Sequence, residues 1–331
     1  MFIVESYSLA VFFCIITMIC WGSWANTQKL TAGTWRFELF YWDYVIGIAF
    51  FSLLLALTLG SAGEQGRPFA ADLIQADRPS LLSAFLGGVI FNAANILLVA
   101  AIAIAGMSVA FPIGIGLALI IGVIVNYIRV PVGEVFLLFT GVGFILLAMV
   151  LNSRAYRKMM ASSKSISTKG LALSVVSGTM MGLFYKYVAV SMFEDFTIPE
   201  KGKLSPYTAV FIFSIGILVS NFIFNSLLMR FPFQGDRVSY ADYFKGSLRN
   251  HMTGILGGSI WCLGMSFNII ASGKAGPAIS YGLGQGATVI AALWGIYVWR
   301  EFDKAPKGTT TILNFMLACF VVGLALIIFS R

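Results

Sequence analysis

Two stretches decide the fold: FLGGVIFNAANILLVAAIAIAG (85–106) and ILGGSIWCLGMSFNIIASGKAG (255–276). Each is apolar over about the 20 residues that a helix needs to cross a bilayer. Each also carries LGG near its start and ends on glycine, and the second lies 170 residues after the first. The same offset pairs further identical residues: Gly114 with Gly284, Gly116 with Gly286, and Tyr127 with Tyr297. We therefore expect a membrane protein with an internal repeat.

The composition of the whole chain excludes a water-soluble protein. Of the 331 residues, 59% are hydrophobic and 11% are charged, and the mean hydropathy is +0.88. Too little polar material remains to cover a soluble surface, which excludes a soluble enzyme and a disordered scaffold. The net charge of +8 comes mostly from short loops between apolar runs. We interpret it as a signal of membrane orientation rather than of a nucleic-acid partner.

Ten apolar runs are long enough to span the hydrocarbon core, and none alternates as barrel strands do. We expect an all-α integral membrane protein surrounded by membrane lipid, without a separate soluble domain. The ten expected helices cover residues 7–26, 42–60, 80–103, 108–128, 132–151, 170–192, 208–229, 251–272, 276–299 and 311–330.

Loop charge predicts the orientation of these helices. The loops after odd-numbered helices hold 14 Lys and Arg residues, whereas the loops after even-numbered helices and the two termini hold 7. By the positive-inside rule the odd loops face the cytoplasm. Both termini are therefore predicted on the outer side of a cytoplasmic (inner) membrane.

The repeat divides the chain into two units of five helices, residues 1–160 and 161–331. In the earlier helices it follows a different offset, since Gly22 pairs with Gly182 at 160. Because five is odd, the second unit must lie upside down relative to the first. Inverted repeats are typical of secondary transporters, which work by alternating access around a midplane site.

Two glycine-rich segments correspond under the repeat, FPIGIGLALIIG (111–122) and SYGLGQGATVIAALWG (280–295). Neither is a dinucleotide fingerprint, because no strand and no βαβ unit surrounds it. Small residues of this kind allow close helix packing. They also allow a partly unwound helix start that frees backbone groups for a solute. Both interpretations remain open.

Polar and aromatic residues inside spans are costly and tend to face a cavity. Amides beside aromatic rings suit a neutral solute, because the amides bind its edges while the rings cover its faces. Helix–helix hydrogen bonding is the alternative for each of them. The candidate lining comprises Trp21, Trp24, Asn92, Asn95, Trp261, Asn268, Tyr281 and Gln285.

Charged residues near spans are few. Lys186 lies inside a span, where it either snorkels to the interface or lines the cavity as a binding cation. Glu38, Asp43 and Glu134 lie at helix ends and are the candidates for ion coupling. His251 is interpreted as a helix-start residue rather than a proton relay.

No cofactor, metal site or enzymatic activity is expected. The cysteines lie in apolar stretches without ligand spacing, and a single histidine cannot complete a Cys/His zinc set. No cluster of acid, base and nucleophile suggests catalysis. The four cysteines, interpreted as packing residues, are Cys14, Cys20, Cys262 and Cys319.

The motifs resemble those of known transporters. VES (4–6), GSW (22–24), YWDY (41–44), GGVIFNAANILL (87–98) and VNY (125–127) resemble plant ureide permeases. GGSIWCLGMSF (257–267) and YGLGQGATVIAALWGIYVWRE (281–301) are similar to bacterial glucose, ribose and rhamnose uptake proteins. These groups form a clan of the drug/metabolite transporter superfamily, which implies ten helices in two inverted repeats.

The second half departs from the sugar-uptake pattern at Cys262, at Met265 and at the Arg300–Glu301 pair. The expected function is import of a small neutral polar solute by alternating access, with possible proton coupling. A sugar is the leading substrate, and a ureide or nucleobase such as allantoin or uracil is the alternative. A membrane assembly or receptor subunit that transports nothing is the third hypothesis.

Overall fold

The computed structural model describes residues 1–31, 34–159, 167–233, 235–303 and 305–331. Within these residues, ten helical segments are long and apolar enough to cross a membrane, which confirms the expected transmembrane helices. The described residues form no β-strand, and their one strand-like contact is a bridge between Met192 and Leu204. The expected boundary between the two five-helix units, at 160/161, falls outside the described residues.

The spans lie close to their expected positions, with ends that differ by at most eight residues, the largest difference being at the end of the fifth span. Their bounds are α1 Tyr7–Ser23 with α2 Ala25–Lys29, α3 Phe37–Leu57, α5 Arg78–Ala105, α6 Met107–Arg129, α7 Val135–Met159, α8 Thr168–Ser191, α9 Pro206–Arg230, α11 Leu248–Ala275, a composite of α12 Pro277–Gly284, α13 Ala287–Leu293 and the π-helical turn η1 Trp294–Val298, and α14 Thr309–Phe329. Two short helices, α4 Phe69–Gln75 and α10 Tyr240–Phe244, lie outside the spans.

Local chemistry sets several helix starts. The first-turn N–H groups of a helix lack intrahelical acceptors, and short polar side chains supply them. Asp77 accepts from the N–H of Ser80 at 2.7 Å before α5, and Ser205 accepts from the N–H of Thr208 at 3.3 Å before α9.

The two glycine-rich segments differ in the structure. The first lies within α6, which continues through Pro112 as one helix. The second is interrupted at Gln285 and Gly286, between α12 and α13. Gln285 and Gly286 nevertheless keep right-handed helical backbone angles, and their N–H groups donate to the carbonyls of Tyr281 and Leu283. Neither segment is therefore unwound, and only the second changes its hydrogen-bond pattern.

Glycine brings the backbones of α5 and α9 into contact. A Cβ added at Gly88 would overlap the carbonyl oxygen of Phe213, and one added at Gly216 would overlap that of Phe85. No rearrangement of side chains could relieve such overlaps, because both obstructing atoms belong to the main chain.

The same contact recurs between α11 and α3. A Cβ at Gly258 would overlap the carbonyl oxygen of Tyr44, and one at Gly47 would overlap that of Ile255. Each residue of this crossing has its counterpart in the α5–α9 crossing at a separation of 169 or 170 residues. The two crossings thus use corresponding positions in the two halves of the chain.

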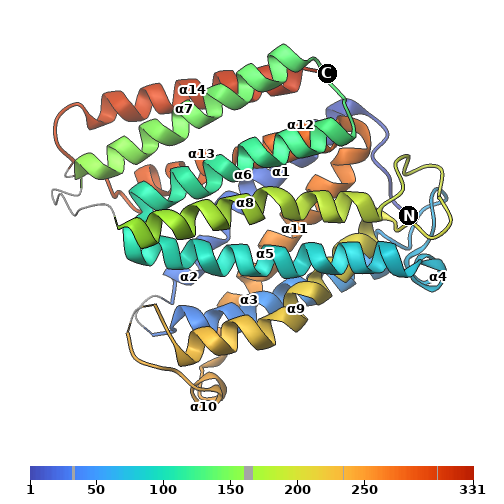
Figure 1. Ribbon diagram of the computed structural model, residues 1–331, viewed down its shortest axis with the longest axis horizontal. Helices are drawn as coiled ribbons and strands as arrows, with labels where there is room; N and C mark the ends of the chain where they lie inside the picture. The colour runs from blue at the N-terminus through green and yellow to red at the C-terminus, as the bar shows by residue number, and fades with distance from the viewer. Residues whose placement is uncertain (32–33, 160–166, 234, 304) are drawn as a thin grey trace.

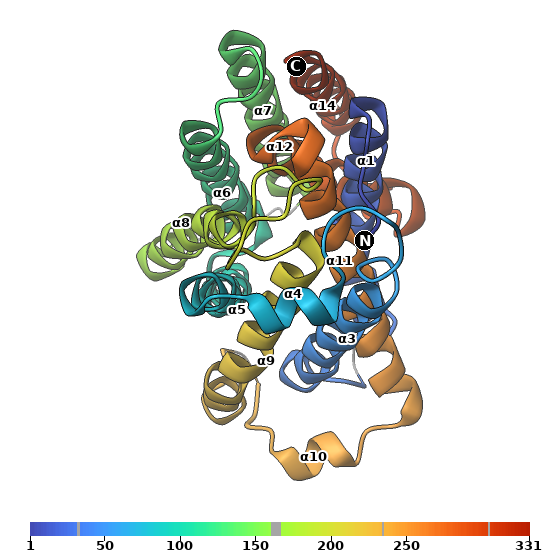
Figure 2. The same cartoon turned by 90° about the vertical axis from the view of Figure 1, so that its right-hand side faces the viewer.

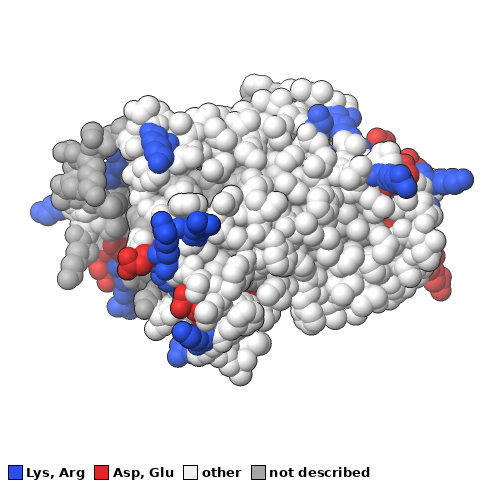
Figure 3. Space-filling model, turned by 60° about the horizontal axis from the view of Figure 1, so that its bottom comes forward, with Lys and Arg blue, Asp and Glu red and all other residues white. Residues whose placement is uncertain are grey.

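The spans run along the long axis, and both termini lie at the same end (Figure 1). Viewed from that end, α11 and α12 lie between α5, α6 and α8 on one side and α1 and α3 on the other (Figure 2). On the face shown in Figure 3, the charged side chains gather at the two ends and leave an uncharged belt between them. Such a belt is the surface that a lipid bilayer requires.

Candidate solute-binding site

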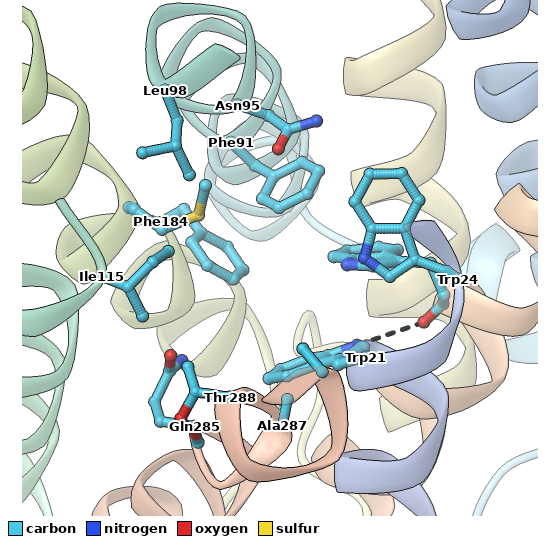
Figure 4. Close-up of a pocket in the computed structure, with 13 residues that line it drawn as sticks. Trp21, Trp24, Phe91, Asn95, Leu98, Ile115, Phe184, Gln285, Ala287 and Thr288 are labelled. Carbon is cyan, nitrogen blue, oxygen red and sulfur yellow. Dashed lines mark hydrogen bonds between the residues drawn. The ribbon is translucent and has the colours of Figure 1, made fainter. Parts of the chain in front are cut away.

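A cavity of about 150 Å³ lies between the two groups of helices. It is lined by α1, α5, α6, α8, α11 and the broken span, so residues far apart in the chain meet there (Figure 4). The lining residues are Trp21, Trp24, Phe91, Asn95, Leu98, Ile115, Met181, Phe184, Trp261, Gln285, Ala287, Thr288 and Ala291.

Aromatic rings form much of the wall. The rings of Trp21 and Trp261 stack at a centroid distance of 6.0 Å with 15° between their planes. Nε1 of Trp21 donates to the main-chain carbonyl of Trp261 over 3.2 Å, which fixes α1 against α11. Phe91 packs on Trp261 at 4.5 Å and on Phe184 at 5.2 Å. Rings held in this way offer flat apolar faces to a planar solute.

A few polar groups converge on the same space. Asn95 donates its amide nitrogen to the Tyr41 hydroxyl over 3.0 Å, and its Oδ1 has no hydrogen-bond partner among the described residues. In that described part of the chain, Nε1 of Trp24 and the side-chain amide of Gln285 also have none. The cavity therefore offers an acceptor, a donor and one group that is both.

A larger space of about 570 Å³ adjoins this cavity and shares Trp21, Trp24, Thr288 and Ala291 with it. It extends along the end of α7 to η1, at the end of the molecule opposite the termini. We call this space the vestibule. It gives the cavity access from that end.

Glu301 links three elements at the vestibule mouth. It pairs with Lys29 after α1 at 2.7 Å and accepts from the hydroxyl of Tyr156 on α7 at 2.7 Å. Burial acts to raise the pKa of Glu301, but the hydrogen bonds from Lys29 and Tyr156 outweigh it, so the pKa lies below its ordinary value of 4.5. Arg300 precedes it at φ +50, the one described non-glycine residue with positive φ.

Toward the termini, packed polar side chains close the cavity. The hydroxyl of Tyr281 reaches the carbonyls of Ala118 and Met181 over 3.3 and 3.2 Å, which joins α12 to α6 and α8. Asn268 donates to the carbonyl of Ser280 at 2.7 Å. Tyr281 and Asn268 were predicted as lining, but both lie outside the lining set and serve these interhelical contacts.

Of the other residues that were expected to line the cavity, some lie at it and some do not. Trp21, Trp24, Asn95, Trp261 and Gln285 do line the cavity. Asn92 lies fully buried behind it, with its side chain hydrogen-bonded to Tyr41 and Ser220. Lys186 is exposed on the outside of α8, so it does not line the cavity, and its position agrees with the snorkelling alternative.

The three coupling candidates lie away from the cavity. Glu38 is buried and paired with Arg36 at 2.7 Å. Glu134 caps α7, accepting from two main-chain N–H groups of the first turn at 2.6 and 2.9 Å. Neither arrangement leaves a carboxylate facing the solute.

Asp43 is the centre of a buried polar cluster. Only 1% of its side chain is exposed, and it accepts from Trp35 at 3.1 Å and Tyr243 at 2.7 Å. Nδ1 of His251 lies 2.8 Å from its Oδ1. His251 is in the first turn of α11, as expected, but the contact with Asp43 was not foreseen because their partnership spans 208 residues.

Sequence reasoning missed the apolar part of the lining. Phe91, Met181 and Phe184 carry no signal that separates a cavity wall from ordinary helix packing. A face shared with Asn95 could have identified Phe91, since the two lie four residues apart on α5. Among the described residues, no group of three His, Cys, Asp or Glu side chains is arranged to hold a metal ion.

The described residues form ten helices long and apolar enough to cross a membrane, with an aromatic-lined cavity among them and a vestibule at one end. This is the architecture of a polytopic membrane transporter. The ureide permease family profile matches residues 40–166 and 156–330, and the chain belongs to that family. Its relatives are named permeases, so the protein is a transporter and not an enzyme.

Two of the relatives cover this chain from end to end. Ureide permease 1 of Arabidopsis thaliana is 25% identical over 100% of this chain and 99% of its own length, and ureide permease 4 of the same plant gives the same figures. Probable ureide permease A3 of Vigna unguiculata is 30% identical over 60% of this chain and 52% of its own. A crystal structure at 14% identity covers 97% of this chain and 96% of its own with a TM-score of 0.60, which shows the fold alone.

These relatives bear on the substrate expectation. They support the resemblance to ureide permeases. They do not support the expectation that the transported solute is a sugar, which rested on the second half of the chain. The departures at Cys262 and Met265 lie in that half, on α11.

Proposed function

We propose that the protein transports a neutral, planar solute of the ureide or nucleobase class by alternating access. The observation that carries this proposal is the cavity itself: the described residues lining it include five aromatic side chains and two amides but no charged side chain. A solute with flat faces and N–H and C=O groups on its edge matches both features. The names of the relatives point to the same class.

A sugar fits the cavity less well. Its ring is puckered and its hydroxyls project on both faces, so stacked rings would leave many of them without partners. An unpaired buried polar group costs about 1–3 kcal/mol. A ureide or nucleobase places its polar groups in one plane, where Asn95, Trp24 and Gln285 can meet them.

Alternating access is supported by the two glycine crossings. Corresponding residues bring α5 against α9 and α11 against α3, as two inverted five-helix units would require. We propose that these units rock about the cavity. The vestibule opens toward the end that carries the loops after the odd-numbered helices, and we assign that end to the cytoplasm of an inner membrane. The described conformation is then open to the inside.

Asp43 is the strongest of the three coupling candidates, because it is buried beside the single histidine and joins α3 to α11. We propose that protonation of Asp43 biases the two units between their states. Asp43→Asn should abolish the stimulation of uptake by an inward proton gradient while leaving solute exchange at equal pH. Stimulation equal to wild type in this variant would exclude Asp43 from coupling.

Ligand-induced stabilisation of the purified protein tests the solute class. Allantoin and uracil should raise the unfolding temperature, because a ligand at 100 times its Kd stabilises by about 2.7 kcal/mol. Hexoses and pentoses should not. Uptake of the stabilising solute into liposomes then separates a transporter from a receptor that only binds. Stabilisation by a hexose alone would contradict the proposed class.

A further inference from the structure

A chain of hydrogen bonds behind the cavity begins at the main-chain carbonyl of Ile217 on α9. Nδ2 of Asn92 donates to this oxygen over 3.3 Å and to Oγ of Ser220 over 2.9 Å. Ser220 in turn donates to the same carbonyl over 3.1 Å. A carbonyl oxygen can only accept, so it fixes the direction of every hydrogen bond in the chain.

The chain of hydrogen bonds continues through Tyr41 to the cavity, and each donor and acceptor role follows from the one before it. With its nitrogen committed, Asn92 presents Oδ1 to the hydroxyl of Tyr41, which donates to it over 2.9 Å. The hydroxyl has one hydrogen, so it can only accept from Asn95, whose Nδ2 lies 3.0 Å away. The remaining atom of the Asn95 amide, Oδ1, is left for the cavity. Figure 4 shows that oxygen on the cavity side of the amide.

We infer that Tyr41 is a positioning residue that holds Asn95 as a hydrogen-bond acceptor and thereby selects a solute N–H. Tyr41 and Asn92 are fully buried and Asn95 is 7% exposed, so water does not compete with this chain of bonds. This inference rests on the proposed function and specifies which edge of the solute the site recognises.

A fixed acceptor discriminates by chemistry. A hydroxyl can rotate to suit either a donor or an acceptor, so a sugar gains nothing from the orientation of the amide. A ring N–H can only donate, and methylation of that nitrogen removes the hydrogen and adds bulk. The wild-type protein should therefore prefer uracil over at least one of its singly N-methylated forms.

Uptake of uracil, 1-methyluracil and 3-methyluracil tests this role. Tyr41→Phe keeps the aromatic ring but removes the hydroxyl that holds the Asn95 amide. This variant should reduce the preference for uracil over its N-methylated form roughly threefold to tenfold. The change should lie in KM and not in kcat. Asn95→Ala removes the acceptor and should narrow the preference at least as far.

Tyr44→Phe is the matched control. Tyr44 lies on the same helix with its ring 5.4 Å from that of Tyr41, and its buried hydroxyl has no partner among the described residues. Loss of that hydroxyl should leave the preference unchanged. If Tyr41→Phe fails to fold, Asn92→Ala removes the acceptor of the Tyr41 hydroxyl and should narrow the preference in the same way.

The outcomes separate this inference from the proposed function. A wild-type preference retained in Tyr41→Phe and lost in Asn95→Ala would overturn the positioning role and leave the solute class standing. Retention in Asn95→Ala would remove Asn95 from recognition altogether. Wild-type protein that takes up a hexose and no uracil or allantoin would overturn the proposed function itself.

Discussion

At the scale of single residues, Trp21 and Gln285 meet at the cavity from the first and ninth spans, more than 260 positions apart in the sequence. Trp21 is held by its bond to Trp261, so it offers only its face. Gln285 lies between α12 and α13, and its side-chain amide has no hydrogen-bond partner among the described residues. The two residues thus combine a rigid apolar wall with an adaptable polar group.

Gln285→Ala should raise the KM for uptake about threefold to tenfold, because one or two hydrogen bonds of about 0.5–1.5 kcal/mol each are lost. Uptake kinetics in liposomes measure this. Gln28→Ala provides the control, since Gln28 lines neither the cavity nor the vestibule. An unchanged KM in Gln285→Ala would show that its amide does not contact the solute.

The sequence could predict five of the nine proposed lining residues, because polar and aromatic types inside spans are unusual. It could not predict which way they point. Lys186 and Tyr185 are neighbours on α8, yet one is exposed and the other fully buried. That choice depends on how α8 rotates against α5 and α6, and the apolar residues around α8 give it no distinct buried face.

At the scale of elements, the glycine crossings fix how the helices meet. Gly88→Ala or Gly258→Ala should destabilise the protein by about 1–3 kcal/mol or more, because main-chain atoms must move apart. Gly143→Ala on α7 is the control, since nothing lies within 4 Å of its added Cβ. Alanine there should be neutral or stabilising by up to about 1 kcal/mol.

Thermal unfolding of the three variants in one detergent measures these differences. Equal stability of Gly88→Ala and Gly143→Ala would contradict the close contact between α5 and α9. Gly88 and Gly258 are recognisable in the sequence as part of the LGG motifs. The sequence does not show which helix faces each of them. Which helix lies opposite is a long-range property, and periodicity within one helix does not encode it.

The Lys29–Glu301 pair joins the end of α2 to the segment that follows η1. Because the Glu301 pKa is lowered from 4.5, the stability that this pair contributes is present above that pH and is lost as the pH falls through the lowered value. The pair should therefore stay intact between about pH 5 and 8. Both side chains are partly exposed, so its contribution is below about 1 kcal/mol.

Glu301→Gln should lower the unfolding temperature slightly at pH 7 and by progressively less below pH 4.5. Unfolding curves of the wild type and the variant across this range provide the measurement. A difference that disappeared between pH 5 and 7 would mean that the pKa of Glu301 is raised instead. Any pH dependence of uptake in that window should come from groups other than Glu301.

At the scale of the whole molecule, the cavity opens toward one end and is closed toward the other by Tyr281 and its neighbours. Ala291 is exposed and lines both the cavity and the vestibule. A cysteine placed there should react with a membrane-impermeant thiol reagent from the side that we propose to be cytoplasmic. The natural cysteines are all buried and should give little background.

Bound solute should slow the reaction of Ala291→Cys, because the two compete for the same space. Ile198→Cys, in the exposed loop after α8, serves as the control and should react only from the outer side. Labelling of intact cells and of inverted vesicles distinguishes the two sides. Reaction of both variants from one side would contradict the assigned path.

The carbonyl of Ile217 has a consequence for how selectivity can evolve. Its oxygen belongs to the main chain, so no substitution can turn it into a donor. For position 95 to present a hydrogen-bond donor to the solute, the side chains hydrogen-bonded in series from this carbonyl would have to change together. Each change alone leaves a buried group without a hydrogen-bond partner. Substitutions at positions 41, 92 and 95 should therefore be strongly epistatic, and new solute preferences should arise by paired changes.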